Sequence, residues 1–389
     1  MNGPTDHRGL RVNERGLTLM EVMMALAISV IVFGGAYQVL YNSQQIQTVN
    51  EQAVQTQQNS RLAMELIALD LKDAGFNAQS LAAGIGNCGV NAILPADNNP
   101  AGNDTGPDSI SMIVPVELST LKTQITGAAP TANVVLQTGA VATAAIDGFG
   151  VAGTPYAMPA PGAVISLAGL QIGTVTAAPS DTVTLSAAVT LPATAVLPVG
   201  TQIYWLKCVM YKIVHPSSNV ATEQPLCGGT LPCLVRGTPP CLTTQPGPAC
   251  VAVADGIEDL QVSYACDGCV GLADGVIDDQ AGGIANQFDA ADFVSNSAWN
   301  AGVFTPLTIR LAQVSVVARQ VGTSIGSESA SQGAKANFTL SPLVVSDHNH
   351  ANGVFAAGDL GTATALTTYQ KQQRRVLTRI VQLRNLGLF

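Results

Sequence analysis

Apolar residues dominate one long segment near the start of the chain, residues 17–41 (LTLMEVMMALAISVIVFGGAYQVLY), whose only charged side chain is Glu21. As a helix this segment would span about 37 Å, enough to cross a hydrocarbon core of about 30 Å. Residues 1–16 are polar and contain three arginines. Because basic residues stay on the cytoplasmic side of a membrane, we expect the rest of the chain to lie across it.

Residues 42–76 keep the helical pattern beyond the apolar segment. Their apolar side chains recur about one turn apart and predict a single apolar face. These positions are Ile46, Val49, Ala53, Leu62, Leu66 and Leu69. The charged side chains nearby, among them Asp70, are expected to point mostly outward. No Gly or Pro occurs from Ala36 to Ala74, and Gly75 supplies a stop. A helix from Leu17 to Ala74 would be about 87 Å long, and its second half is expected to pack on a sheet.

From about residue 77 the pattern changes to alternating or β-branched runs bounded by Gly, Pro, Asn and Asp, which are typical of strands joined by turns. The expected strands are 109–118, 133–137, 163–177, 181–187, 201–214, 257–266, 305–320 and 369–385. Residues 77–389 are therefore predicted to form a β-rich head, in which the nearly uncharged stretch 120–200 is a β insertion. The expected fold class is α+β, a long N-terminal helix packed on an antiparallel sheet with an enlarged head.

The composition excludes some classes of protein. Of the 389 residues, 47% are hydrophobic and 11% are charged, which favours a folded core over disorder. The formal net charge is −9. Phosphate binding needs Lys and Arg, so this acidic balance argues against nucleic acid as the main partner.

Cysteine usage indicates an oxidising compartment. Seven of the eight cysteines lie in the region 208–269, and an even number beyond a membrane anchor predicts disulfides. Three pairs are close enough in sequence to staple local loops, namely Cys227/Cys233, Cys241/Cys250 and Cys266/Cys269. Cys88 and Cys208 are then left for a longer bridge. Spacing alone does not determine the connectivity, and Cys266-Asp-Gly-Cys269 also has the spacing of zinc ligands, although a matching second CxxC is missing.

Glu21 is the informative residue of the apolar segment. A carboxylate inside an apolar span costs about 3 kcal/mol on insertion unless something pairs with it, so it indicates a function. The run Arg15-Gly16-Leu17-Thr18-Leu19-Met20-Glu21 resembles the class III signal of type IV prepilins. The resemblance implies that a prepilin peptidase cuts after Gly16 and methylates the new amine of Leu17. Leu17 stands where the family usually has Phe, a change that we expect the peptidase to tolerate.

Cleavage would place a new charge beside the apolar segment. The ammonium group of Leu17 would lie at the same membrane depth as Glu21 of a neighbouring subunit. Their pairing in a low dielectric would relieve both desolvation costs and set the stagger between subunits. We therefore expect the chain to join a helical filament through this pair.

Other interpretations of the segment stay open. It could be a cleaved secretory signal with Gly34-Gly35-Ala36 as a poor small-residue site, or a plain signal anchor, and Glu21 could be an acid near the membrane interface. The first residue of the mature chain separates the three processing schemes. It would be Leu17 for a prepilin, Tyr37 for a secretory signal and Met1 for an anchor.

Segments spread along the chain are similar to the PilW family of type IV pilus assembly proteins. They are residues 59–76 (NSRLAMELIALDLKDAGF), 254–268 (ADGIEDLQVSYACDG), the strand 309–319 (IRLAQVSVVAR) and the C-terminal 374–385 (RRVLTRIVQLRN). The similarity is strong at both ends and weak in the middle. It implies a non-enzymatic minor pilin that initiates pilus assembly in a tip complex and so serves twitching motility or adhesion. Its implied partners are other minor pilins, the major pilin, the prepilin peptidase and the inner-membrane assembly platform.

The resemblance also implies an inner-membrane protein with a periplasmic head before assembly and a pilus protein afterwards. Two rival functions remain. One is a minor pseudopilin of type II secretion, which shares the processing signal. The other is an adhesin or exoenzyme that merely has a pilin-like anchor. Deletion phenotypes would discriminate the first rival, and ligand binding by residues 77–389 would discriminate an adhesin.

Candidate chemistry elsewhere is sparse. Asp267, Asp274, Asp278 and Asp279, in the run CDGCVGLADGVIDD, resemble a loose calcium loop, but they do not form the D-x-D-x-D-G pattern, and a solvated turn is the alternative. His348 and His350 could offer imidazoles to a metal, but a polar surface loop explains them as well. The Walker A and HExxH motifs do not occur in the sequence. We therefore expect no cofactor, with calcium as the one candidate.

Overall fold

The computed structural model describes sixteen ranges of the chain. They are residues 18–76, 84–96, 107–137, 159–178, 181–215, 226–228, 231–239, 241, 250–269, 272–277, 287–289, 292–295, 306–320, 343–344, 354–355 and 374–384. The chain divides into two compact units, Met1–Glu51 and Gln52–Phe389. Gly16 and Leu17 lie outside the described residues.

One long helix, α1, runs from Leu19 to Asp73 and confirms the helix that the apolar pattern predicts. It contains a stretch long and apolar enough to cross a membrane, and none of that stretch is buried within the chain. The helix stops at Gly75, whose positive φ of 76° favours glycine. There the backbone N–H of Gly75 donates to the carbonyl of Ile113, 3.0 Å away, which ties the end of α1 to a strand.

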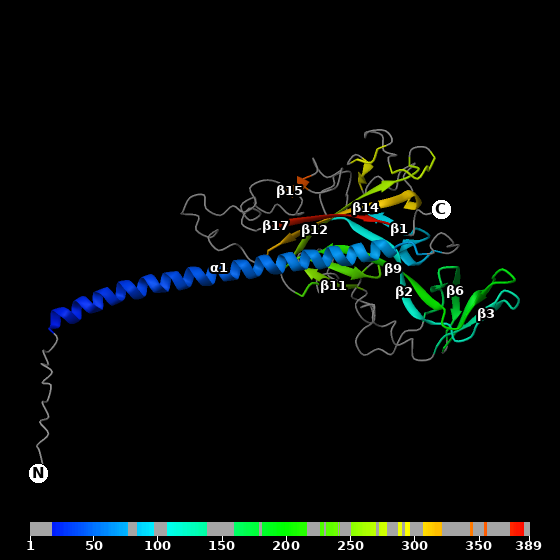
Figure 1. The fold of residues 1–389 in the computed structure, drawn as a ribbon, viewed down its shortest axis with the longest axis horizontal. Coiled ribbons are helices and arrows are strands. Elements are labelled where there is room, and N and C mark those ends of the chain that lie inside the picture. Colours follow the sequence, from blue (N-terminus) through cyan, green and yellow to red (C-terminus); the bar gives the residue numbers. More distant parts are fainter. Residues whose placement is uncertain are drawn as a thin grey trace, which may run out of the picture. The chain divides into compact units, whose positions relative to one another are not determined.

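The head contains two main antiparallel sheets (Figure 1). The first has the order β1-β2-β9-β5-β6-β7-β4, with β10 and β11 paired beside β9. Its strands are β1 (Ile93–Ala96), β2 (Ser109–Thr120), β4 (Thr131–Val135), β5 (Val164–Leu167), β6 (Gln171–Ala177), β7 (Thr182–Val189), β9 (Gln202–Val214), β10 (Cys233–Gly237) and β11 (Cys250–Asp255). The second has the order β13-β12-β14-β17. Its strands are β12 (Ile257–Cys266), β13 (Val294–Ser295), β14 (Ile309–Arg319) and β17 (Arg374–Gln382). Together they confirm the α+β class.

Short elements complete the described chain. Two small ladders join β3 (Ile125–Thr126) to β8 (Val196–Leu197) and β15 (Leu343–Val344) to β16 (Val354–Phe355). Two 3-10 turns are η2 (Gly86–Cys88) and η7 (Pro306–Thr308). The prediction of a single strand over 163–177 is wrong, because the chain turns between β5 and β6. Ala168 and Gly169 have positive φ there, and the position of a Cβ on Gly169 would lie 3.0 Å from the Phe76 ring.

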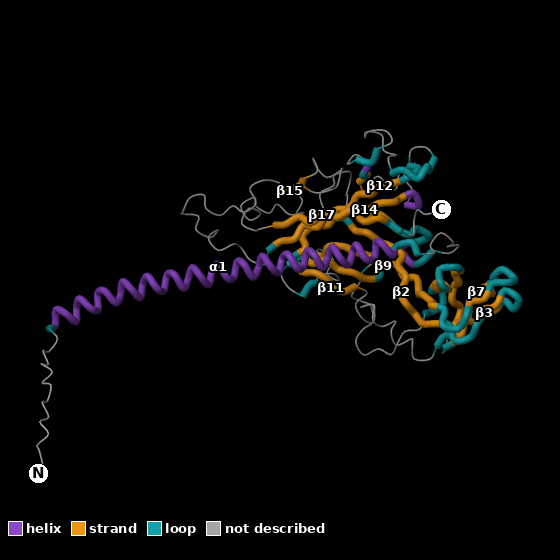
Figure 2. Tube along the Cα trace, in the orientation of Figure 1, coloured by secondary structure: helices purple, strands orange, loops and turns teal. Residues whose placement is uncertain are grey.

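The principal core lies between the second half of α1 and the two sheets, as Figure 2 shows for the purple helix running along the orange strands. The helix contributes Ala63, Met64, Ile67, Ala68 and Leu71, all of them buried. The predicted apolar face is therefore partly wrong, because Leu62 and Leu69 are 46% and 57% exposed. Small residues on the observed face let α1 approach the strands closely, and the buried charged group on that face, Asp70, is paired.

Three further cores support the outer parts of the head. Strands β3 to β8, which lie within the predicted insertion, enclose a separate apolar cluster that includes Leu136, Val183 and Ile203. A second cluster covers β10 and contains four cysteines. A third lies around η2 and joins the loop after α1 to the central strand β9. The insertion therefore packs mainly on itself.

All eight cysteines form disulfides, in the four pairs that the spacing suggests. Cys88–Cys208 connects the loop after α1 to β9 over a sequence separation of 120 residues. The other three bridges close short loops of the cysteine-bearing region. Because Cys266 and Cys269 bond to each other, they do not offer thiolates to zinc.

Candidate functional site

The first turn of α1 carries the residues around Glu21. Thr18 stands immediately before the helix, and its backbone N–H and hydroxyl both donate to Glu21 Oε2, at 2.9 and 3.1 Å. In return, the Glu21 backbone N–H donates to Thr18 Oγ1 at 3.3 Å. This reciprocal arrangement is a capping box, which satisfies N–H groups that would otherwise lack a partner at a helix start.

The capping box determines where the carboxylate of Glu21 lies. The side chain folds back toward the N-terminal end of α1 rather than out along the helix, so one oxygen is held by Thr18. The other oxygen, Oε1, accepts no hydrogen bond from the described residues. The site therefore presents a charged carboxylate oxygen beside the point where residue 17 joins the chain. Sequence reasoning identified Glu21 but missed Thr18, although the T-x-x-E spacing was available as a signal.

Apolar side chains surround this carboxylate on the helix surface. Leu19, Met20, Met23 and Met24 are all more than half exposed within the single chain. In a membrane these side chains would face lipid or neighbouring helices, where no water hydrates the Glu21 carboxylate. The arrangement therefore leaves one carboxylate oxygen in apolar surroundings, where a cationic group could pair with it.

A second polar group, centred on Asp70, links the C-terminal part of α1 to the strands of the head. Asp70 Oδ2 accepts a hydrogen bond from the Tyr211 hydroxyl at 2.6 Å and from Arg236 Nε at 2.7 Å. Burial lowers the pKa of the Arg236 guanidinium by itself, but the bonds with Asp70 outweigh this effect and raise it. Burial, together with the charge of Asp70, also raises the pKa of Tyr211. The three side chains therefore form a largely buried polar group that links α1, β9 and β10, and the prediction that Asp70 points outward is wrong.

A third polar group lies in the second sheet. Glu258 of β12 accepts hydrogen bonds from Arg374 Nε at 2.6 Å and Arg374 Nη2 at 3.2 Å, and it forms an ion pair with Arg319 at 3.2 Å. The side chains of Arg374 and Glu258 are 0% and 2% exposed. The sequence pattern gave no signal for this group, because the two arginines lie 61 and 116 residues away from Glu258.

His215 lies beside this ion group and is expected to make the head sensitive to acid. Burial lowers the pKa of its imidazole, and the charge of Glu258 opposes the effect only in part. Because the folded state disfavours protonation, His215 costs no stability above the unfolded pKa of about 6.5 and destabilises the head as the pH falls below it. Urea unfolding of the full chain at pH 8 and pH 5 should show that the free energy of unfolding falls less between these two pH values for His215→Gln than for the parent. Equal losses would contradict this prediction.

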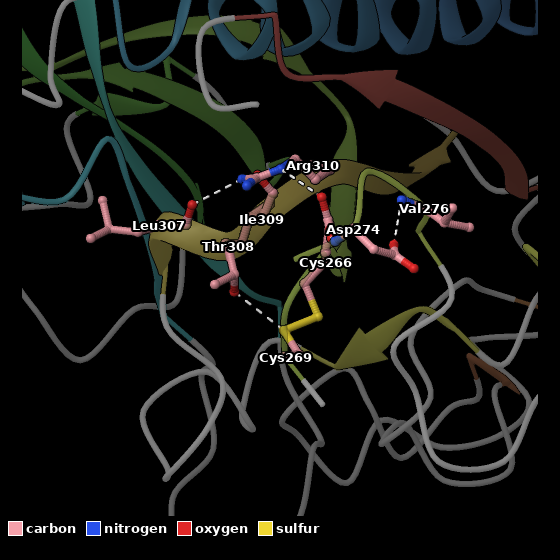
Figure 3. A network of polar contacts seen from close by, with 9 residues as sticks. Cys266, Cys269, Asp274, Val276, Leu307, Thr308, Ile309 and Arg310 are labelled. Carbon is pink, nitrogen blue, oxygen red and sulfur yellow. Dashed lines mark hydrogen bonds and ion pairs between the residues drawn. A yellow bond between two sulfur atoms is a disulfide. The ribbon is translucent and has the colours of Figure 1, made fainter. Parts of the chain in front are cut away.

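Two of the calcium candidates, Asp267 and Asp274, lie in a hydrogen-bonded turn after β12 (Figure 3). Asp267 Oδ1 accepts from the backbone N–H of Asp274 at 3.0 Å, and Asp274 Oδ1 accepts from that of Val276 at 2.8 Å. Asp267 also lies 3.9 Å from Arg310 Nε. Within the residues that the structure describes, no group of three or more His, Cys, Asp or Glu could hold a metal. Asp278, Asp279, His348 and His350 lie outside those residues.

Comparisons with known proteins place two family matches on the chain. The model of type IV pilus-assembly protein W matches residues 220–385, which include β10 to β17. The model of the prokaryotic N-terminal methylation motif matches residues 11–37, which include the capping box. No curated protein and no solved structure matches the chain significantly.

Proposed function

We propose that this chain, a PilW-family pilin with a prepilin-type N-terminal signal, is a minor pilin that enters the type IV pilus through α1 and helps to prime assembly in a tip complex. The PilW family consists of structural components of the pilus, so the proposal assigns no catalysis. The observation that carries it is the combination of the methylation motif with Glu21, held at the start of an apolar helix with one oxygen available.

Processing would complete the site. The prepilin peptidase would cut after Gly16 and methylate Leu17, leaving a positive amine one residue before Thr18. That amine would pair with a carboxylate of a neighbouring minor or major pilin that corresponds to Glu21, because two opposite charges in an apolar environment relieve each other's desolvation. The inner-membrane assembly platform would lift the subunit from the bilayer into the fibre.

The head supports the proposed location outside the cytoplasm. Four disulfides join its cysteines, and disulfides persist in the periplasm and on the cell surface. The chain would therefore begin as an inner-membrane protein with a periplasmic head and end on the pilus.

Mass spectrometry of sheared pili tests the proposal. We expect a minor fibre component whose N-terminal peptide begins at Leu17 and carries an added methyl group. A mature chain that begins at Tyr37 or Met1 would overturn the prepilin assignment. Absence of the protein from the fibre would overturn its role as a subunit.

Deletion of the gene separates the pilus from a secretion pseudopilus. We expect loss of surface pili and of twitching, with exoprotein secretion unchanged. Loss of exoprotein secretion with normal pili would instead assign the protein to type II secretion. Complementation with the parent chain should restore the piliated state.

A further inference from the structure

Strand β17 forms one end of the second sheet. Within the residues that the structure describes, it pairs only with β14, through nine consecutive residue pairs from Arg319↔Arg374 to Leu311↔Gln382. The ladder contains no bulge and the strand contains no Gly or Pro. A long and regular edge of this kind is a template for pairing with another strand.

The other ends of the two main sheets are protected in ways that β17 is not. Strand β1 has only four residues and contains Pro95, and β13 has two residues. The pairing of β4 with β7 shifts register between Thr131 and Asn133, and that of β10 with β11 shifts between Leu234 and Val235. Proteins use short strands, prolines and bulges to prevent unwanted pairing. Strand β17 contains none of these features, and the part of its edge considered for pairing is the end that contains Ile380 and Gln382.

On the opposite side of the same sheet, Asp108 bonds to outward-facing backbone groups of β12. Its backbone N–H donates to the carbonyl of Leu260, and its carboxylate accepts from the N–H of Val262 at 2.8 Å. All ten residues of β12 are buried. In β17, by contrast, Arg375, Arg379, Ile380 and Gln382 are exposed, and the Ile380 side chain is 48% exposed.

Backbone geometry shows which groups β17 turns outward. The N–H of Leu383 donates to the carbonyl of Arg310, so odd-numbered residues of the strand point their backbone groups toward β14. The backbone N–H and C=O groups of the even-numbered residues Ile380 and Gln382 therefore point away from β14. A partner strand could bond to these groups without disturbing the ladder with β14.

Charge indicates the kind of strand that would fit. Residues 371–389 contain five basic residues and no Asp or Glu, in a chain of net charge −9. Arg379 is exposed, and Arg375 is exposed beside Gln57 of α1. Two copies of β17 paired antiparallel about Arg379 would place like charges opposite each other, which destabilises a sheet. Carboxylates at alternate positions of a different strand would instead pair with these arginines.

We propose that the outer edge of β17 binds an extended, acidic strand of a different protein by β-strand addition. Backbone hydrogen bonds from Ile380 and Gln382 supply affinity, and the arginines select carboxylates on one face of the incoming strand. The proposal does not rest on the function proposed above, because any partner with such a strand satisfies it.

Site-specific photo-crosslinking in cells that naturally make the protein tests this. A photoreactive phenylalanine replaces Ile380 in the full chain, and the control has it at Leu170, which is 70% exposed in the turn between β5 and β6. We expect an adduct from position 380 alone, and mass spectrometry should map it to a segment of another protein with alternating Asp or Glu. Arg375→Glu with Arg379→Glu should reduce the adduct by about tenfold, since each charge reversal opposes the carboxylates.

Gln382→Pro provides a second arm, because it removes an outward N–H without touching the ladder to β14. It should also reduce the adduct, while the chain keeps the parental melting temperature. The proposal is overturned by no adduct, by an adduct within the same chain or with a second copy, or by an adduct to a segment without acidic residues. It is equally overturned if both sets of variants crosslink like the parent.

Discussion

Replacement of Glu21 with alanine is expected to leave the chain in the membrane and to remove it from pili. Insertion should persist because the change deletes the only charged side chain of residues 17–41 and makes the segment more apolar. Incorporation should fail because the amine of a neighbouring Leu17 would lose its carboxylate in an apolar environment, a penalty of about 3–5 kcal/mol for breaking a buried pair. Immunoblots of membrane and sheared-fibre fractions measure both outcomes.

A matched variant separates the charge of Glu21 from its capping role. Glutamine keeps an oxygen that can accept from the Thr18 N–H, as Glu21 Oε2 does now, but it carries no charge. If the charge is what matters, Glu21→Gln should be excluded from fibres as completely as Glu21→Ala. Thr18→Val, which removes the hydroxyl bonds alone, should cost about 1 kcal/mol of helix-end stability and leave incorporation largely intact. Normal amounts of Glu21→Ala in the fibre would refute the pairing.

Features that depend on local sequence were predictable. The helix follows from the apolar run and from the absence of Gly and Pro between Ala36 and Ala74, and its end follows from Gly75, because these are properties of neighbouring residues. The three short disulfides join cysteines at most nine residues apart, so loop closure alone favours these pairs. With six cysteines used, Cys88 and Cys208 remain, and the long bridge follows by elimination.

Features that depend on distant partners were not predictable in the same way. Spacing cannot tell whether Leu69 or Asp70 faces the core, because the answer depends on Arg236, which lies 166 residues away. A leucine is the usual choice for the core, and an aspartate is buried only when a cation arrives to pair with it. The Glu258 group has the same origin, since β12 meets Arg374 only through the pairings of β14 with both strands.

Replacement of Glu258 with glutamine is expected to destabilise the head by about 3–5 kcal/mol, because it leaves the buried guanidinium of Arg374 without its carboxylate. Arg319 shares that carboxylate, and burial already lowers the pKa of its guanidinium. Urea unfolding of the full chain in detergent micelles, followed by tryptophan fluorescence, measures the loss. Glu65→Gln on the exposed side of α1 is the control and should change stability by less than about 0.5 kcal/mol.

The interpretation of that loss requires a double-mutant cycle. If the penalty comes from an uncompensated charge, Glu258→Gln combined with Arg374→Gln should be less destabilised than the sum of the two single variants, with a coupling of about 1–3 kcal/mol. If the two side chains only fill space, the effects should add. An additive cycle, or a Glu258→Gln variant as stable as the parent, would show that β17 is held to the sheet by its ladder with β14 rather than by this ion group.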